Sequence, residues 1–285
     1  METRTYGFRN ESLRATLSMK IGWYTHHIEN TPNVAVGGSV SPTGLFTGQF
    51  AGGAEMSDYE YRMQAPLGFE IEIVTPYTFD THDIHQFDSV IVTGTDAFTD
   101  QQLNRLSEYD PFVFVHHLQT PRAGLNALIR GSRLFVTHTP AHMRKELSWS
   151  KPRKTAQVLS YFDTSKCYDH MDKQPFALWA ARNHPLKGQL RAHAWAAQAG
   201  YEFKALTDVP REQVLDAMAR CEWFVHLPLA FESECRAVME AVLSGCRIHT
   251  NENVGITSVD DWHDADALRH MVDKAGDTFW KLVQQ

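Results

Sequence analysis

The stretch that decides the fold is FVHLPLAFESECRAVMEAVLSGCRIHTNENVG, residues 224–255. Trp223–Leu227 is an apolar run typical of a strand, and Pro228 ends it. Apolar residues then recur at helical spacing up to Gly245, which predicts a helix that a glycine terminates. Cys246–Thr250 predicts the next strand. The stretch therefore predicts a strand-helix-strand unit of an α/β protein.

Two carboxylates, Glu232 and Glu240, stand in this unit with seven residues between them. Glu232 falls in the loop after the first strand, and Glu240 falls inside the helix. Ligands of open α/β sheets bind at such carboxyl ends of strands, so both glutamates are placed to accept hydrogen bonds from sugar or ribose hydroxyls. The alternative is that they are solvated carboxylates whose charge complements the helix dipole.

The same alternation of strands and helices extends along the chain. Short runs rich in Val, Ile and Phe predict strands, and helical patterns lie between several of them. The predicted strands are Lys20–Thr25, Phe69–Thr75, Ser89–Thr93, Phe112–His116, Leu134–His138, Phe176–Ala181 and Glu202–Leu206; the predicted helices are Glu55–Gln64, Asp100–Leu106, Gly188–Ala199, Arg211–Arg220 and Met271–Val283. We therefore expect two α/β domains, residues 1–155 and 156–285, with the boundary inside Trp149–Gln174.

The composition agrees with a folded protein of this size. The chain has 285 residues, of which 43% are hydrophobic, and a net charge of -7. This hydrophobic content is enough to form hydrophobic cores. The negative net charge argues against a protein that binds nucleic acid by neutralising many phosphates, although a local basic groove is compatible with it. The four cysteines have no C-x-x-C spacing, and no leader or long apolar span is recognised. We therefore expect a cytoplasmic protein without a transmembrane segment.

Residues 232–255 resemble the donor-site signature of retaining glycosyltransferases of family 4. The matching parts are the E-x7-E pattern of Glu232 and Glu240, the helix MEAVLSG, and the turn Asn253-Val254-Gly255. This resemblance implies the GT-B fold, in which two Rossmann-like domains with parallel sheets face each other across a cleft. The chain departs from the family after Glu232, where glycines are usual and Ser233, Glu234, Cys235 and Arg236 stand instead.

A second resemblance lies in FALWAARNHPLKG, residues 176–188, which is similar to a family strand ending in GR-x-x-x-x-KG. Arg182 and Lys187 stand at the matching positions, and Ala181 replaces the usual glycine. An arginine fork and a lysine point charge at a strand end suit a diphosphate leaving group. The alternative is a pair of solvated surface cations.

The first half carries two further features of the family. Gly52 and Gly53 precede a predicted helix, as in the family's GGAE loop, where glycine lets the backbone approach a phosphate. His138 ends a predicted strand in FVTHTPAH and matches the region where the family places a histidine against the donor sugar. The alternative for His138 is a structural histidine at a strand end.

The resemblance implies a retaining transfer of a sugar from a nucleoside-diphosphate sugar to an acceptor hydroxyl. The implied catalytic residues are His138, Arg182, Lys187 and Glu232. The implied donor-binding residues are Gly52, Gly53, Arg182, Lys187, Glu232, Ser233, Glu234, Cys235, Arg236 and Glu240, of which Glu240 would bind the ribose. The acceptor classes left open are saccharides, lipids, small molecules and hydroxymethylated DNA bases, the last being the one way in which a nucleic acid would be a partner.

No essential metal or other cofactor is expected. Asp264-Ala265-Asp266 has the D-x-D form of metal-dependent transferases, but its position predicts capping of the last helix. By resemblance, that helix crosses back onto the first domain. Two other functions stay open at this point: a nucleotide-sugar epimerase of GT-B fold, and a non-catalytic nucleotide-sugar-binding partner subunit.

Overall fold

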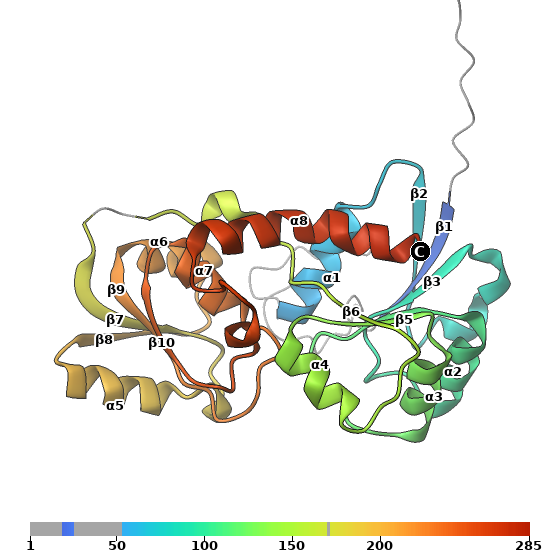
Figure 1. The fold of residues 1–285 in the computed structure, drawn as a ribbon, viewed down its shortest axis with the longest axis horizontal. Coiled ribbons are helices and arrows are strands. Elements are labelled where there is room, and N and C mark those ends of the chain that lie inside the picture. The colour runs from blue at the N-terminus through green and yellow to red at the C-terminus, as the bar shows by residue number, and fades with distance from the viewer. Residues whose placement is uncertain (1–18, 26–52, 170–171) are drawn as a thin grey trace, which may run out of the picture.

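The computed structural model describes residues 19–25, 53–169 and 172–285. These residues form two parallel sheets covered by helices (Figure 1). The alternation of strand and helix predicted from the apolar runs is confirmed. Asp100–Leu106 and Arg211–Arg220 are helices with the predicted bounds.

The first sheet has six described strands in the order β2-β1-β3-β4-β5-β6, all parallel. Its inner strands β3, β4 and β5 are buried along their whole length, as expected for strands covered on both faces. The strands are β1 (Met19–Tyr24), β2 (Phe69–Val74), β3 (Ser89–Val92), β4 (Phe112–Phe114), β5 (Leu134–Thr137) and β6 (Thr155–Gln157); the helices are α1 (Gly53–Met63), α2 (Asp100–Leu106), α3 (Ala123–Gly131) and α4 (Pro140–Leu147).

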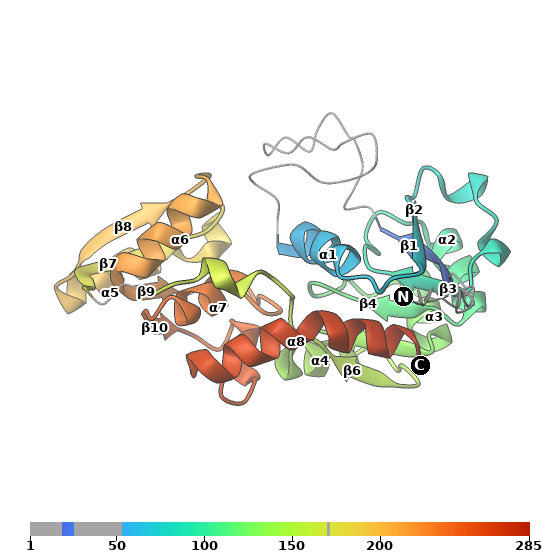
Figure 2. The ribbon, with the colours of Figure 1, turned by 90° about the horizontal axis from the view of Figure 1, so that it is seen from above.

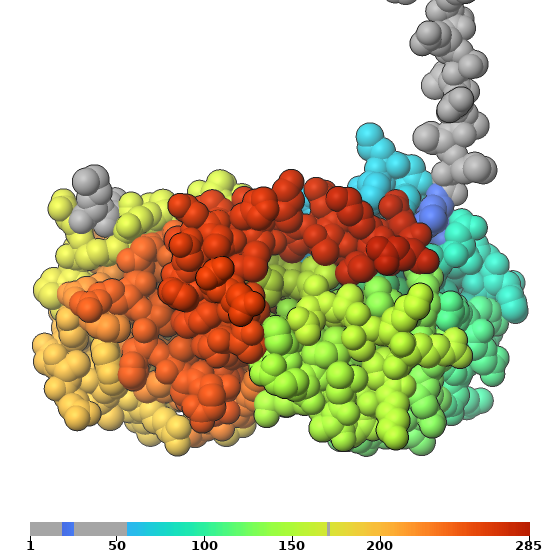
Figure 3. Space-filling view, in the orientation of Figure 1, coloured from blue at the N-terminus to red at the C-terminus, as the bar shows by residue number. Residues whose placement is uncertain are grey.

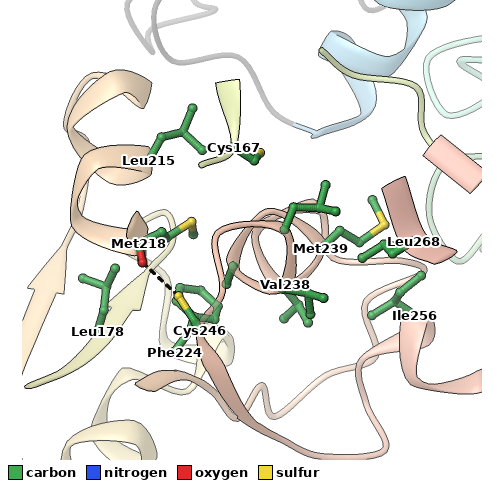
Figure 4. Close-up of a cluster of buried hydrophobic side chains, with 14 of the residues drawn as sticks. Cys167, Leu178, Leu215, Met218, Phe224, Val238, Met239, Cys246, Ile256 and Leu268 are labelled. Carbon is green, nitrogen blue, oxygen red and sulfur yellow. Dashed lines mark hydrogen bonds between the residues drawn. The ribbon is translucent and has the colours of Figure 1, made fainter. Parts of the chain in front are cut away.

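The second sheet has four described strands in the order β10-β9-β7-β8, again all parallel. Its strands are β7 (Gln174–Ala180), β8 (Glu202–Leu206), β9 (Cys221–His226) and β10 (Arg247–Thr250); its helices are α5 (Gln189–Ala199), α6 (Arg211–Arg220) and α7 (Arg236–Leu243). The core between this sheet, α6 and α7 is shown in Figure 4, where Met218, Phe224, Val238 and Met239 pack together. Beside them the Cys246 thiol donates to the Met218 carbonyl at 3.0 Å.

Strand order reverses once in each sheet. In the first sheet the reversal lies between β1 and β3, and in the second it lies between β7 and β9. Ligands of open parallel sheets bind outside the carboxyl ends of the strands at such switch points. The residues that follow β7 and β9 are therefore the first place to look for a site.

The last helix, α8 (Ala265–Val283), connects the two domains. Asp264 caps its start by accepting hydrogen bonds from the backbone N–H groups of Asp266 and Ala267, which confirms the capping role predicted for this aspartate. Leu268 and Val272 pack in the core of the second domain. Phe279 and Trp280 lie in the core of the first. Both ribbon views show α8 running alongside the two domains, and in the space-filling view it spans them at the surface (Figures 1, 2 and 3).

The connection between the two sheets follows β6. β6 pairs with β5 in the first sheet, so a boundary at residues 155 and 156 falls inside this strand. The second sheet begins with β7 at Gln174, which leaves residues 158–173 as the connection. None of the described helices is long and apolar enough to cross a lipid bilayer.

Phe279 provides a test of the packing of α8. Its ring is fully buried and stacks on Tyr61 at 4.3 Å between centroids, with Trp23, Phe112 and Phe114 around it. Phe279→Ala should lower the free energy of unfolding by about 3–5 kcal/mol, because it removes a large buried ring and leaves a cavity. Urea unfolding measures the loss. Leu190→Ala, at an exposed position of α5, is the control and should change stability by less than about 0.5 kcal/mol; an equally small effect at Phe279 would contradict the packing.

Candidate functional site

Glu232 lies where the ends of β7 and β9 meet. Its Oε1 is 2.9 Å from Nε2 of His226, the last residue of β9. The same oxygen is 3.1 Å from Nζ of Lys187, which lies in the loop after β7. The structure thus brings together two residues predicted from the sequence, Glu232 and Lys187, at the switch point of the second sheet.

Two close backbone approaches hold this arrangement. Gly188 has a φ of 76°, and a Cβ on it would lie 2.0 Å from the carbonyl oxygen of Leu227, so only glycine lets the Lys187 loop approach the end of β9. A Cβ on Gly255 would lie 2.0 Å from the Ser233 carbonyl oxygen. In addition, the Glu232 backbone donates to Asn253 at 2.7 Å and accepts from Gly255 at 2.8 Å. The Asn253-Val254-Gly255 turn therefore fixes the position of Glu232.

The charge of Glu232 is strongly stabilised. Burial alone would raise the pKa of this carboxyl group, but the hydrogen bond and positive charge of His226 and the positive charge of Lys187 outweigh it and lower the pKa to about 2. Glu232 is therefore an ionised acceptor at neutral pH. The role of His226 was missed in the sequence, although its place as the last residue of a strand ending beside Glu232 was a usable signal.

Arg182 also follows β7 but lies apart from this pair. Its side chain is exposed, and among the described residues it forms no hydrogen bond or ion pair. An exposed, uncommitted guanidinium near Lys187 is free to move toward an anion. The structure places Arg182 in the same loop as Lys187 without bringing the two into contact.

Glu240 belongs to a separate charge cluster. It is 1% exposed, and its Oε1 accepts from Nε of Arg236 at 2.8 Å and from the Arg211 guanidinium. Arg236 in turn forms a bidentate pair with Glu60 of α1, at 2.7 and 3.1 Å. Burial, followed by the repulsion of Arg236, lowers the pKa of Arg211 to about 9. In this structure both Glu240 and Arg236 are committed to protein contacts that tie α7 to α1 of the first domain.

Ser233 and Glu234 face the first domain. The Ser233 hydroxyl donates to the His116 carbonyl at 2.6 Å, and the Ser233 carbonyl accepts from the Thr139 hydroxyl at 2.7 Å. The Ser160 backbone N–H donates to Glu234 Oε1 at 2.6 Å. Burial raises the pKa of Glu234 to about 7, against the hydrogen bonds from Ser160 that lower it. These two residues, which the resemblance assigns to the donor, contact the first domain in this structure.

Cys235 adopts a backbone conformation that glycine prefers. Its φ is 74°, in the left-handed region, and it directly precedes α7. The residue lies in the segment where the family of the E-x7-E signature has glycines. The chain thus keeps the backbone shape that a glycine would allow, with a thiol added.

His138 lies at the carboxyl end of β5 and is 3% exposed. Its Nε2 is 3.1 Å from Nδ1 of His116, whose Nε2 is 2.7 Å from Asp58 of α1. Burial, followed by the charges of His116 and His142, lowers the pKa of His138 well below its usual value, so the ring is neutral at pH 7. His138 is also 3.6 Å from Glu234 Oε2. It therefore belongs to a buried polar row at the face that the first sheet turns to the second domain.

The glycine loop predicted before α1 is described only in part. Gly53 is the first residue of α1, and Gly52 lies outside the described residues. A hollow of about 510 Å³ lies elsewhere, between α8 and the two segments that follow β5 and β6. His138 is the one predicted site residue on its wall. The strand ends around Glu232 are thus distinct from this hollow.

The chain is similar to known proteins in structure. No family model matches the chain, and no curated protein matches it in sequence. Among solved structures, AviGT4, a glycosyltransferase involved in avilamycin A biosynthesis, is similar with a TM-score of 0.60 and 14% identity over 93% of this chain and 95% of that one. Sucrose-phosphate synthase from Thermosynechococcus elongatus has a TM-score of 0.59 and 12% identity over 93% of this chain and 94% of that one. HepE from Anabaena, in complex with UDP and glucose, has a TM-score of 0.52 and 12% identity over 93% of this chain and 95% of that one.

The fold is GT-B. This confirms the fold expected from the resemblance. In the GT-B arrangement found here, the loop from Glu232 to Arg236 carries three kinds of contact. Glu232 faces the ends of β7 and β9, Ser233 and Glu234 lie against His116 and His138 of the first domain, and Arg236 reaches α1. The loop is therefore one of the places where the two GT-B domains meet.

The lowered pKa of Glu232 predicts a pH-dependent contribution to stability. Because the folded-state pKa of about 2 lies below the usual 4.5, the stabilisation is fully present above pH 4.5 and is lost as the pH falls toward 2. Glu232→Gln should lower the free energy of unfolding by on the order of 3 kcal/mol near neutral pH, and more than half of this difference should disappear by about pH 3.

Denaturant unfolding of both proteins across this pH range measures the difference. Glu252→Gln, at an exposed turn position, is the control and should change stability by less than about 0.5 kcal/mol. A difference between Glu232→Gln and the natural protein that stays constant from neutral to acid pH would show that the carboxylate is not held ionised by its partners.

Proposed function

We propose that this protein is a retaining glycosyltransferase that moves a sugar from a nucleoside-diphosphate sugar to the hydroxyl of an acceptor. The observation that carries the proposal is the pairing of Lys187 and Glu232 at adjacent strand ends beside the switch point of the second GT-B sheet. A charged sugar donor needs both a cation and a hydrogen-bond acceptor, and this pair would supply them. The similarity to AviGT4, to sucrose-phosphate synthase and to HepE with bound UDP and glucose supports the same class of reaction.

Lys187 and Arg182 are the proposed partners of the diphosphate. Cleavage of the sugar–phosphate bond leaves negative charge on the departing diphosphate, and fixed cations stabilise that charge more in the transition state than in the ground state. Lys187 is about one-third exposed and Arg182 is exposed, so both side chains have room to turn toward a ligand. These two cations take the part that a metal ion plays in other transferases, and the proposal therefore needs no essential metal.

Glu232 is the proposed acceptor for a hydroxyl of the transferred sugar. Its carboxylate is ionised and positioned by His226, and a sugar hydroxyl that donates to it would lie beside the Lys187 ammonium group. We propose that His138, which is neutral and buried, acts together with His116 to fix the surface of the first domain that faces Glu232. Front-face attack by the acceptor on the side of the departing diphosphate then gives retention without a covalent sugar–protein intermediate.

The proposal assigns Glu240 and Arg236 differently from the resemblance. The resemblance gives the ribose hydroxyls to Glu240, whereas the contact geometry favours a role in which Glu240 holds Arg236 against Glu60. Ser233 and Glu234 are likewise assigned to the domain interface. A cytoplasmic location is part of the proposal, and the four free cysteines support a reducing compartment.

The acceptor is proposed as a hydroxyl compound of one of four classes. Saccharides, lipids, small molecules and hydroxymethylated DNA bases all offer the nucleophile that the reaction needs. The buried row formed by Asp58, His116 and His138 lies on the first-domain side of the interface, and the acceptor would approach from this side. A screen of these acceptor classes with one accepted donor identifies the class.

Lys187 and Arg182, the two proposed partners of the diphosphate, provide the test of the proposed function. Lys187→Ala and Arg182→Ala should each lower turnover by about 10²-fold or more, because the leaving diphosphate loses a preorganised cation. Diphosphate release from a panel of nucleotide sugars measures the rate. Arg191→Ala, at an exposed position of α5, is the matched control and should transfer at the rate of the natural protein.

Three outcomes would contradict the proposal. Transfer at the natural rate by both Lys187→Ala and Arg182→Ala would show that these two residues do not bind the diphosphate. Formation of an epimerised nucleotide sugar would favour the epimerase. Binding of the donor without release of the nucleoside diphosphate in the presence of any acceptor would favour the non-catalytic binding protein.

A further inference from the structure

Three side chains of metal-ligating type converge at the end of β9. One ligand atom each from His226, Glu232 and Cys235 lies within 4.8 Å of the other two. We propose that these three residues form a binding site for a thiophilic divalent ion of the zinc type, and that this ion excludes the sugar donor from Lys187 and Glu232. The first part stands on the geometry alone, and the second part rests on the proposed function.

The ligand set favours zinc over calcium or magnesium. An imidazole, a thiolate and a carboxylate are the three ligand types that zinc accepts in proteins, whereas calcium and magnesium require oxygen ligands. Three protein ligands leave the fourth tetrahedral position open to water or to a ligand oxygen. His226 is 1% exposed and Glu232 is 16% exposed, so two of the ligands are fixed by the surrounding protein before an ion binds.

The backbone at Cys235 is a second, independent observation. A non-glycine residue at φ 74° and ψ 79° is conformationally unfavourable, and such residues gather at functional sites. In this conformation the thiol sulfur lies within 4.8 Å of a Glu232 carboxylate oxygen. Glycine would meet the backbone requirement without strain, but it would supply no ligand. The sulfur is thus held toward Glu232 and His226 by a strained residue.

Binding of the ion would change the partners of Glu232. At present the Lys187 ammonium group lies 3.1 Å from Glu232 Oε1, and this cation would have to move into solvent when a divalent ion binds the same oxygen. The Cys235 thiol would lose its proton to water on forming the metal–sulfur bond. Two ligand charges, from the thiolate and the carboxylate, then balance the two charges of the ion.

Competition with the sugar donor follows from this exchange. The proposed donor site uses Glu232 for a sugar hydroxyl and Lys187 for the diphosphate. The ion would bind Glu232 and displace the Lys187 ammonium group. The ion would therefore act as an inhibitor that competes with the donor, and a chelator would reverse it. No change at the acceptor side of the interface is needed.

Cobalt(II) is the probe for the site itself, because a cobalt–thiolate bond gives a charge-transfer absorption band that zinc lacks. Titration of the natural protein with Co²⁺ should produce this band with saturation. Cys235→Ser and Cys235→Gly should both abolish it, and the glycine variant is suited to the left-handed backbone and so removes the thiol without strain. His226→Gln should weaken Co²⁺ binding by at least about tenfold.

The control is Cys246→Ser. The sulfur atoms of Cys221 and Cys246 are 3.3 Å apart, which makes this pair the alternative thiol site. Circular dichroism of each variant checks folding. The band should survive in Cys246→Ser. Absence of a band in the natural protein, or a band lost in Cys246→Ser and kept in Cys235→Gly, would overturn the site.

A kinetic measurement separates the two parts of the inference. Zn²⁺ should raise the donor KM of the natural protein and leave the donor KM of Cys235→Gly unchanged. Cobalt binding through Cys235 without any effect of Zn²⁺ on the donor KM would overturn the competition and leave the site standing. If no nucleotide sugar is a substrate, the proposed function fails, and the cobalt titration still decides whether the site exists.

Discussion

The structure depends on the way in which the loop from Glu232 to Cys235 is held between two domains. Its backbone is held on one side by Asn253 and Gly255 and on the other by Thr139, and the Ser233 hydroxyl adds a hydrogen bond to the His116 carbonyl. Because Gly255 has no side chain, the Ser233 carbonyl can approach it closely. Glu232 therefore points to the ends of β7 and β9 while its neighbours bind the first domain. Any movement of one domain against the other would be transmitted to the proposed donor site through this loop.

Much of the fold could be predicted because the inner strands of the first sheet are buried on both faces. Runs such as Ser89–Thr93 and Phe112–His116 have continuous apolar segments, Val90–Val92 and Phe112–Val115, which is the pattern of inner parallel strands. β6 was not predicted, since Thr155–Gln157 is a mostly exposed edge strand with little apolar content. α4 was missed for a different reason: its polar and charged residues hide the periodicity, and His142 and Glu146 are buried against the usual expectation.

The candidate site was predictable only where spacing along the chain decides proximity. Glu232 and Lys187 meet because each follows one of two adjacent strands, and strand ends are visible in the sequence. The partners of Arg236 and Glu234 are set by tertiary structure. Glu60 is 176 residues away from Arg236 along the chain, and Ser160 is 74 residues away from Glu234. No local pattern distinguishes a donor-binding arginine from one that joins α7 to α1.

The central claim is that a nucleoside diphosphate binds beside Lys187 and Glu232, and calorimetric titration of the natural protein with nucleoside diphosphates tests it most directly. The account predicts saturable binding of at least one of them, weakened as salt is added, and binding of the matching nucleoside without phosphates at least about tenfold weaker. Equal affinity for the nucleoside and its diphosphate, or no binding of any nucleoside diphosphate, would contradict it.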